Sequence, residues 1–380
     1  MIYLDNAATT SVDPEVFDAM KPYFKEYYGN PGSLHAAGRK AYEAVEKARK
    51  QVADFIDADP SQIIFTSGGT EANNMVFHRV GGYSFKTALV SAGEHESVLK
   101  AAQNYYRCIK IPLLEAGWID FQEFVDLLSK NDVGIVSVMH TNNETGMTNN
   151  VREIAKKCHE YEVPFHTDCV QAAGYCRISV EEIGCDFLSL SSHKIRGPKG
   201  LGALYVRNPG KFEAMISGGS MQEFGLRGGT ENVPGIVGFG AACKLAAQNL
   251  LRQRQRIDYM SHYFFIQLFA SLADNNVSDL FFANGNLLLG MQKTYSIGFK
   301  GISNEALLVL LDARGVCVSA GSACTASEHK ASHVLTAMGI SEEMANNSIR
   351  ISFSPANTVK EVEKAAKIIG ECVAALANSI

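Results

Sequence analysis

Short apolar runs of strand length recur through the first half of the chain, and each stops at polar or glycine residues. They occupy residues 62–66, 87–90, 133–139, 163–167 and 187–190. Runs of this length, bounded by turn-forming residues, are typical of buried strands. Because helical patterns separate them, their order predicts a mostly parallel, doubly wound sheet of the α/β class.

Helical periodicity is clearest in residues 41–55, where small and apolar side chains recur every three or four positions. They are Ala41, Val45, Ala48, Val52 and Phe55. This spacing places them on one face of a helix. We expect Lys47, Arg49 and Lys50 to lie on its solvated side. Asp13, followed by proline, marks another helix start.

The pattern changes from about residue 252 onward, where helical runs dominate. Residues 294–299 alternate apolar and polar positions, which predicts a half-buried strand. A helix is expected over 303–311 and a strand over 316–318. These elements predict a small α+β domain next to a large one. The expected bounds are residues 14–255 for the large domain, and residues 1–13 with 256–380 for the small domain.

Composition is that of an ordinary globular protein and narrows the classes of function. Of 380 residues, 46% are hydrophobic and 20% are charged, and the formal net charge of -5 gives no basic surface for nucleic acid. No apolar run approaches a membrane span, and the first residues do not form a signal peptide. The nine cysteines are odd in number and lack C-x-x-C spacing. We therefore expect neither a disulfide framework nor a metal site, and a cytoplasmic location.

Polar side chains with distinct chemistry follow the predicted strands. The run 187–190 leads into Lys194, which can form a Schiff base with an aldehyde. The other runs lead to Asp168, to the glycine turn 67–70 and to His95. Alone, each is more simply an ordinary loop residue. Together they match pyridoxal phosphate, which needs a lysine, a carboxylate for its ring nitrogen, a phosphate cradle and a flat group over its ring.

Longer stretches then point to a family. They are residues 3–10, 29–31, 66–71, 94–95, 142–144, 192–200, 227–230, 319–324 and 348–350. On these motifs the chain resembles a cysteine desulfurase of the NifS/IscS-like group, among the class-V, fold-type-I pyridoxal phosphate enzymes. The motifs follow the family's order over nearly the whole chain. The resemblance implies a seven-stranded sheet in a large domain, a small domain and a homodimer.

The resemblance also implies a role for each matching residue. Lys194 would hold the cofactor covalently, Asp168 would pair with its ring nitrogen, and Gln171 would bond its phenolic oxygen. His95 would stack on the ring and assist proton transfer. Five residues would hold the phosphate, the last of them supplied by the other subunit: Gly69, Thr70, Ser191, His193 and Thr230.

Asn143, which also contacts the cofactor, and Arg350 would bind the carboxylate of the substrate L-cysteine. Cys324 stands among small polar residues, 319–327, which favours an exposed loop and a reactive thiol. In the family this cysteine attacks the substrate's sulfur, which gives L-alanine and a persulfide. The persulfide passes to a sulfur-acceptor protein for iron–sulfur cluster, thio-cofactor or tRNA synthesis. Four other cysteines are expected to be buried and inert: Cys108, Cys243, Cys317 and Cys372.

Three alternatives stay open at the level of sequence. The same fold could act on selenocysteine or cysteine sulfinate. A class-V aminotransferase would not need the cysteine loop, and a non-catalytic sulfur-pathway subunit would not need the cofactor.

The sequence departs from the family pattern at several positions, and these departures bear on the choice of partner protein. Gln292-Lys293 replaces the usual Pro-Asn, residues 328–331 and 351–354 differ, and the chain ends at Ile380 without the longer tail that docks a scaffold in some relatives.

Overall fold

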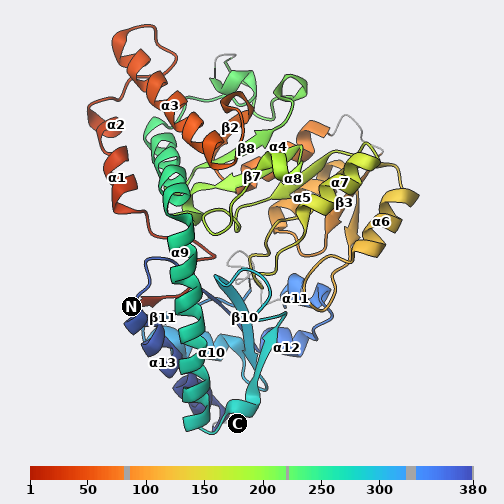
Figure 1. Ribbon diagram of the computed structural model, residues 1–380, viewed down its shortest axis with the longest axis vertical. Coiled ribbons are helices and arrows are strands. Elements are labelled where there is room, and N and C mark those ends of the chain that lie inside the picture. Colours follow the sequence, from red (N-terminus) through yellow and green to blue (C-terminus); the bar gives the residue numbers. More distant parts are fainter. Residues whose placement is uncertain (81–85, 220–221, 322–330, 379–380) are drawn as a thin grey trace.

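A long helix connects two parts of the molecule. The computed structural model describes residues 1–80, 86–219, 222–321 and 331–378. Figure 1 shows a larger part built around a twisted sheet and a smaller part below it, with helix α9 (Val233–Asp274) running through both. The amino terminus lies in the smaller part, beside strand β11 (Val316–Cys317). In the described ranges no helix combines the length and the apolarity needed to cross a membrane.

The larger part is built on one sheet, which has seven strands in the described part of the chain. In spatial order they are β2 (Ile63–Thr66), β8 (Gly202–Val206), β7 (Phe187–Ser191), β6 (Phe165–Asp168), β5 (Val133–Ser137), β3 (Thr87–Ser91) and β4 (Arg107–Ile111). Strand β8 is antiparallel to both of its neighbours, and the other pairs are parallel. The mostly parallel α/β sheet is therefore confirmed.

Helices cover both faces of this sheet, which is why most of its strands are buried along their whole length; the edge strand β4 is the exception. Strand β3 shows the division, since Leu89 packs into one hydrophobic cluster, and Ala88 and Val90 into another. The cluster of Leu89 includes α1 (Pro14–Met20), α3 (Ala36–Phe55), α6 (Phe121–Lys130), α7 (Val151–Glu160), α8 (Val180–Ile183) and the start of α9. The opposite cluster includes α4 (Gly69–Val80) and α5 (Glu96–Tyr105). Helix α2 (Pro22–Lys25) follows α1.

Helix α3 confirms the predicted apolar face but corrects the placement of Arg49. Lys47 and Lys50 are exposed, as expected, whereas the Arg49 side chain is only 3% exposed. Its guanidinium donates to both carboxylate oxygens of Glu223, at 2.8 and 2.9 Å. Glu223 also accepts a hydrogen bond of 2.7 Å from the main-chain N–H of Phe65. The helical period could not show this pair, because the two residues lie 174 positions apart.

Replacing Arg49 by alanine should lower the free energy of unfolding by about 3–5 kcal/mol, because Glu223 would be left as an uncompensated buried charge. Urea denaturation followed by circular dichroism would measure the loss. Lys50→Ala is the matched control on the same helix. It removes an exposed pair with Asp54, for which about 0–1 kcal/mol is expected. Equal stability of the two variants would contradict a structural role for the buried pair.

The smaller part holds two small sheets in the described ranges. The first has the order β12 (Ser348–Ser352), β10 (Thr294–Phe299) and β9 (Phe281–Asn284), and the second pairs β1 (Ile2–Tyr3) with β11. The strand expected at 294–299 is present, but the expectation that it is half-buried is wrong, because every residue of β10 is buried. One polar side chain of β10 has a partner inside the protein, since Asn284 donates to the Ser296 hydroxyl at 2.9 Å, whereas the Thr294 hydroxyl is buried without a partner in the described structure.

Four helices, α10 to α13, accompany these strands in the described ranges. They are α10 (Asn304–Ala313), α11 (His333–Ala337), α12 (Glu342–Asn346) and α13 (Val359–Ala377). Short 3₁₀ turns complete the described elements: η1 (Pro60–Gln62), η3 (Ser192–Lys194), η4 (Pro209–Lys211), η5 (Gln222–Gly225) and η6 (Ser278–Leu280). The helix expected at 303–311 and the strand expected at 316–318 are confirmed within one or two residues at their ends.

Helix α9 spans the proposed domain boundary at residue 255. Its buried residues up to Ala246 belong to the core of the larger part. Those from Ile257 onward belong to the core of the smaller part, together with Ile2 and Leu4 from the amino terminus. The division into residues 14–255 and residues 1–13 with 256–380 stays a prediction, with which this change of core along α9 agrees, although Tyr175 packs in the core of the smaller part.

Candidate active site

One pocket of about 200 Å³ collects most of the predicted site residues. They are Gly69, Thr70, His95, Asn143, Asp168, Gln171, Ser191, His193, Lys194 and Arg350. The pocket forms where the strand ends of β2, β3, β6 and β7 meet the amino-terminal segment and β12. Because carboxyl ends of parallel strands lie at one edge of a sheet, sequence-distant residues converge there.

Lys194 is the last residue of η3, the turn that follows β7. Its Nζ donates to the main-chain carbonyls of Ala7 and Ala8, at 2.5 and 2.7 Å. Burial lowers the pKa of Lys194 to about 7, and the positive charges of Arg350 and Lys293 add to this effect. Near neutral pH much of this amine is therefore uncharged, the form that reacts as a nucleophile or a base.

Asp168 ends strand β6 and is buried at the floor of the pocket. One carboxylate oxygen accepts from the Val170 main-chain N–H and the other from the side-chain amide of Asn73, both at 2.9 Å. Sequence reasoning missed Asn73. The available signal was its position on α4, one helical turn after Gly69, which places both residues on the same face of the helix.

The opposite end of the pocket is suited to an anion. Helix α4 begins at Gly69, so its positive dipole end and free N–H groups lie where Thr70 and Ser191 line the pocket. A Cβ on Gly69 would lie 3.0 Å from a methyl group of Val170 and 3.7 Å from the Ser191 Cβ, so glycine keeps this cradle open. Burial, with Lys194 and Lys199, lowers the pKa of His193 to about 4, so its imidazole is neutral at pH 7.

His95 lies at the start of α5 and is its N-cap. Its Nδ1 accepts a hydrogen bond of 3.2 Å from the Ser97 main-chain N–H. A neutral imidazole with Nδ1 as acceptor carries its proton on Nε2. Burial lowers the pKa of His95, against the opposing effect of Asp168, which favours this neutral form.

Arg350, in β12, is only 2% exposed and is held by two partners. One terminal nitrogen donates to the Asn143 main-chain oxygen at 3.1 Å, and the other donates to the Asp5 carboxylate at 2.8 Å. The Arg350 Nε is buried without a partner in the described structure. Sequence reasoning missed Asp5 as the residue that orients this guanidinium.

Two predicted residues are not part of the pocket in the described structure. Thr230 is exposed and does not line it. Its loop is tied to α4, because Arg227 donates to the Glu71 carboxylate at 2.9 Å. Cys324 lies outside the described residues, which exclude 322–330.

The cysteines expected to be buried and inert divide into two groups. Cys243 and Cys372 are buried as expected, whereas Cys108 and Cys317 are only half-buried. Burial raises the thiol pKa of all of them, which disfavours the reactive thiolate.

The pocket residues fit pyridoxal phosphate. The donor set has a lysine of lowered pKa, a buried carboxylate and a glycine-opened helix start. Two buried amide oxygens, those of Asn73 and Gln171, have no hydrogen-bond partner in the described structure, so the polar walls retain capacity for a ligand. Lys194 and Asp168 would hold the aldehyde and the ring nitrogen, and Gly69 and Thr70 the phosphate.

The rate at which the apoprotein takes up pyridoxal phosphate should rise with pH through about 7 and then level off. The neutral amine of Lys194 is the reacting form, and it predominates above its pKa of about 7. An unshifted lysine, with a pKa of about 10.4, would keep the rate rising to pH 10. Stopped-flow absorbance would record the profile, with Lys199→Ala as a control that should follow the wild type. A rate still increasing tenfold per pH unit at pH 9 would contradict the lowered pKa.

Comparison with known proteins gives one consistent family. The Aminotransferase class-V family model matches residues 2–365. A protein of Dictyoglomus turgidum named cysteine desulfurase IscS is 38% identical over 371 residues, which cover 95% of this chain and 91% of that protein. The solved NifS-like protein from Rickettsia africae ESF-5 has a TM-score of 0.88 at 32% identity, covering 98% of this chain and 99% of that one. A structure described as SspA in complex with cysteine has a TM-score of 0.79 at 30% identity, covering 94% and 100%.

Proposed function

This chain belongs to the class-V aminotransferase family and is a cysteine desulfurase of the NifS/IscS-like group, and from this premise we propose how its own residues act. It converts L-cysteine into L-alanine and carries the removed sulfur as a persulfide on Cys324. The observation that supports this most is the pocket that unites Lys194, Asp168 and Arg350. A sulfur-acceptor protein then takes the sulfur for iron–sulfur cluster, thio-cofactor or tRNA synthesis.

The chemistry of the substrate's carbon atoms depends on an electron sink. Pyridoxal phosphate, when bound, supplies a ring that stabilises negative charge on the substrate. Asp168 would keep the ring nitrogen of the bound cofactor protonated, and Asn73 and Val170 fix the orientation of its carboxylate. Lys194 Nζ moves protons to and from the substrate, because its lowered pKa lets it act as a base and as an acid near neutral pH. His95, protonated on Nε2, is placed in the same pocket to assist.

Arg350 binds the substrate carboxylate. A guanidinium has five N–H donors in a planar fork, and Arg350 uses two of its nitrogens for Asn143 and Asp5. Among the described residues its remaining N–H groups have no hydrogen-bond partner, so they can donate to a carboxylate, and burial strengthens such a charge-assisted bond. Asp5 holds the fork in one orientation, which reduces the ordering cost when the substrate binds.

The nucleophile of the sulfur-transfer step is the thiolate of Cys324. A bond forms between the Cys324 sulfur and the substrate's sulfur as the substrate's carbon–sulfur bond breaks. The carbon takes up a proton and leaves as L-alanine, and the enzyme keeps one additional sulfur atom as a persulfide. The electrons balance without an external oxidant, because the substrate's carbon gains the electron pair of the broken carbon–sulfur bond and is reduced, while the two sulfur atoms are oxidised to the persulfide level.

Turnover with a panel of substrates tests this function. L-Cysteine should give L-alanine, and intact-protein mass spectrometry should show one extra sulfur atom located on Cys324. L-Selenocysteine and cysteine sulfinate, offered separately, measure how strictly the site selects sulfur. Transamination of an amino acid with a keto acid, in place of alanine and persulfide formation, would instead identify an aminotransferase.

The active unit that we propose is a cytoplasmic homodimer. Thr230 is exposed on a loop held by the Arg227–Glu71 ion pair. From that loop its hydroxyl would complete the phosphate cradle of the partner subunit. Sedimentation at working concentration would test the dimer, and a stable monomer would contradict it.

A further inference from the structure

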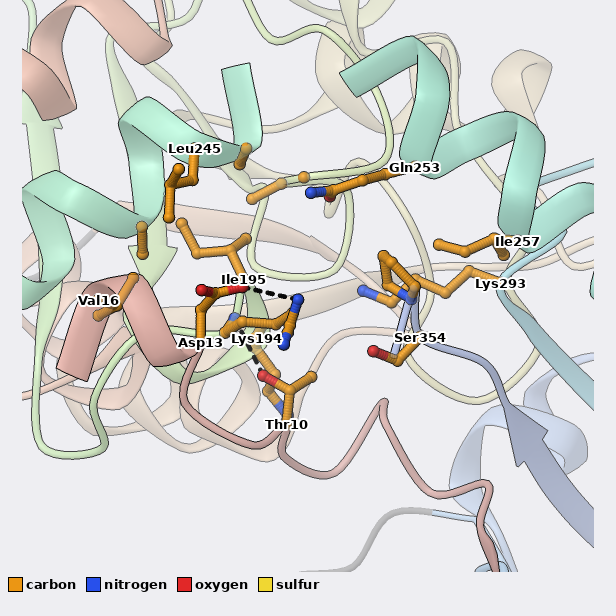
Figure 2. Close-up of a pocket in the computed structure, with 16 residues that line it drawn as sticks. Thr10, Asp13, Val16, Lys194, Ile195, Leu245, Gln253, Ile257, Lys293 and Ser354 are labelled. Carbon is orange, nitrogen blue, oxygen red and sulfur yellow. Dashed lines mark hydrogen bonds and ion pairs between the residues drawn. The ribbon is translucent and has the colours of Figure 1, made fainter. Parts of the chain in front are cut away.

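A second, smaller cavity of about 30 Å³ shares Lys194 with the pocket but is otherwise lined by different residues. It is enclosed by the segment before and in α1, by α9, and by the residues that precede β10 and follow β12. Figure 2 shows Lys293 extending into this space from the β10 side, between Gln253 of α9 and Ser354.

Lys293 is a buried cation without a partner among the residues that the structure describes. Its side chain is 5% exposed. Within the described residues its Nζ donates no hydrogen bond and no carboxylate forms an ion pair with it. Burial lowers the pKa of Lys293 to about 8, against a small opposing effect of Cys176, so the amine stays mostly protonated at neutral pH. A buried ammonium is unfavourable unless an opposite charge compensates it.

The other buried polar groups at the cavity leave donors free. The Ser354 hydroxyl accepts from the Ala356 N–H, which leaves its own proton available. Arg196 pairs with Asp13 at 2.7 Å through a terminal nitrogen, but its Nε is buried without a partner in the described structure. The carboxylate of Asp13 is thus engaged by Arg196, and it forms no ion pair with Lys293 in the described structure.

The remaining polar groups of the lining are satisfied or partly exposed. The Thr10 hydroxyl donates to the His193 carbonyl and accepts from the Arg196 N–H. Lys194 donates to two carbonyls. The half-exposed Gln253 can turn its NH₂ group toward the space. Free donors and an uncompensated cation therefore face one small volume, the combination that an anion requires.

We propose that this cavity binds a small monovalent anion of the size of chloride, with Lys293 as its charged ligand. A space of this volume holds about one or two water-sized particles, so it is too small for a phosphate ester or an amino acid. Apolar side chains of α9, such as Leu245 and Ile257, form another wall and limit exchange with water. Because Lys194 lines both spaces, the anion would lie next to the pocket.

Crystals of the cofactor-loaded protein soaked in bromide give the most direct test. An anomalous peak is expected within hydrogen-bonding distance of Lys293 Nζ in the wild type and is expected to be absent in Lys293→Met. Lys293→Gln serves if the methionine variant does not fold, because it keeps a donor but lacks the charge, and it should also lose the peak. A water molecule, or no density, at this position in the wild-type crystal would overturn the proposal.

Thermal unfolding in solution provides the second measurement. At constant ionic strength, replacing gluconate by chloride should raise the unfolding temperature of the wild type in a saturable manner. Lys293→Met should lose the saturable part, or require at least about tenfold more chloride. Lys300→Met, which removes an exposed lysine of the same part of the protein, should respond like the wild type. Equal curves in chloride and gluconate, or an unchanged chloride response in Lys293→Met, would refute the site.

Discussion

Replacing Cys324 by serine should abolish sulfur release from L-cysteine while leaving cofactor binding intact. Serine is close to cysteine in size but is a far weaker nucleophile at neutral pH. Alanine formation should fall by at least about a thousandfold, which corresponds to ~4 kcal/mol of lost transition-state stabilisation. The residues that line the pocket all lie outside the changed segment, so the absorbance of the bound cofactor should match that of the wild type. Amino acid analysis and intact-protein mass spectrometry would measure alanine and persulfide.

A second cysteine provides the matched control for this experiment. Cys317 is half-buried on β11, close in sequence to Cys324, and burial raises its pKa. Cys317→Ser should keep turnover and persulfide formation near wild-type levels. If Cys324→Ser released sulfur at the wild-type rate, or if Cys317→Ser alone stopped it, the assignment of the nucleophile would be wrong.

Replacing Lys194 by alanine should remove the covalent link between protein and cofactor and reduce turnover below detection. Among the described residues, Lys194 is the only lysine that lines the pocket. Borohydride reduction of the wild type, followed by peptide mass spectrometry, should place the cofactor on the peptide that contains Lys194. The variant should give no labelled peptide and should lose the absorbance of the linked cofactor.

Two neighbouring lysines serve as controls for the covalent link. Lys199 follows the turn after Lys194 in sequence, and Lys293 lines the adjacent cavity. Lys199→Ala and Lys293→Met should both retain the label on Lys194. A label that moved to either residue in the wild type would relocate the reactive amine and overturn the proposed site.

The sequence by itself determined the elements and most of the chemistry of the pocket. Apolar runs of strand length predicted β2, β3, β5, β6 and β7 and a mostly parallel sheet, because strands buried on both faces are rich in apolar residues. They did not predict β4, β8 or the spatial order of the strands. Polar residues of the pocket also stand at or just after the ends of these runs, as with Lys194 after β7 and Asp168 at the end of β6. Hydrophobic periodicity and the ends of strands depend on residues that are close together in the chain, so they can be predicted from one sequence.

Only the tertiary structure decided which charged groups meet. Arg49 has the helical position of a solvated residue, yet Glu223 reaches it from 174 positions away. Asp5 and Arg350 are 345 positions apart, and Asn73 and Asp168 are 95 apart. Lys293 shares a cavity with Lys194, although the residues next to Lys293 in the sequence do not indicate this. The physical reason is that periodicity reports burial along one element, whereas the partner of a buried charge depends on how distant elements pack.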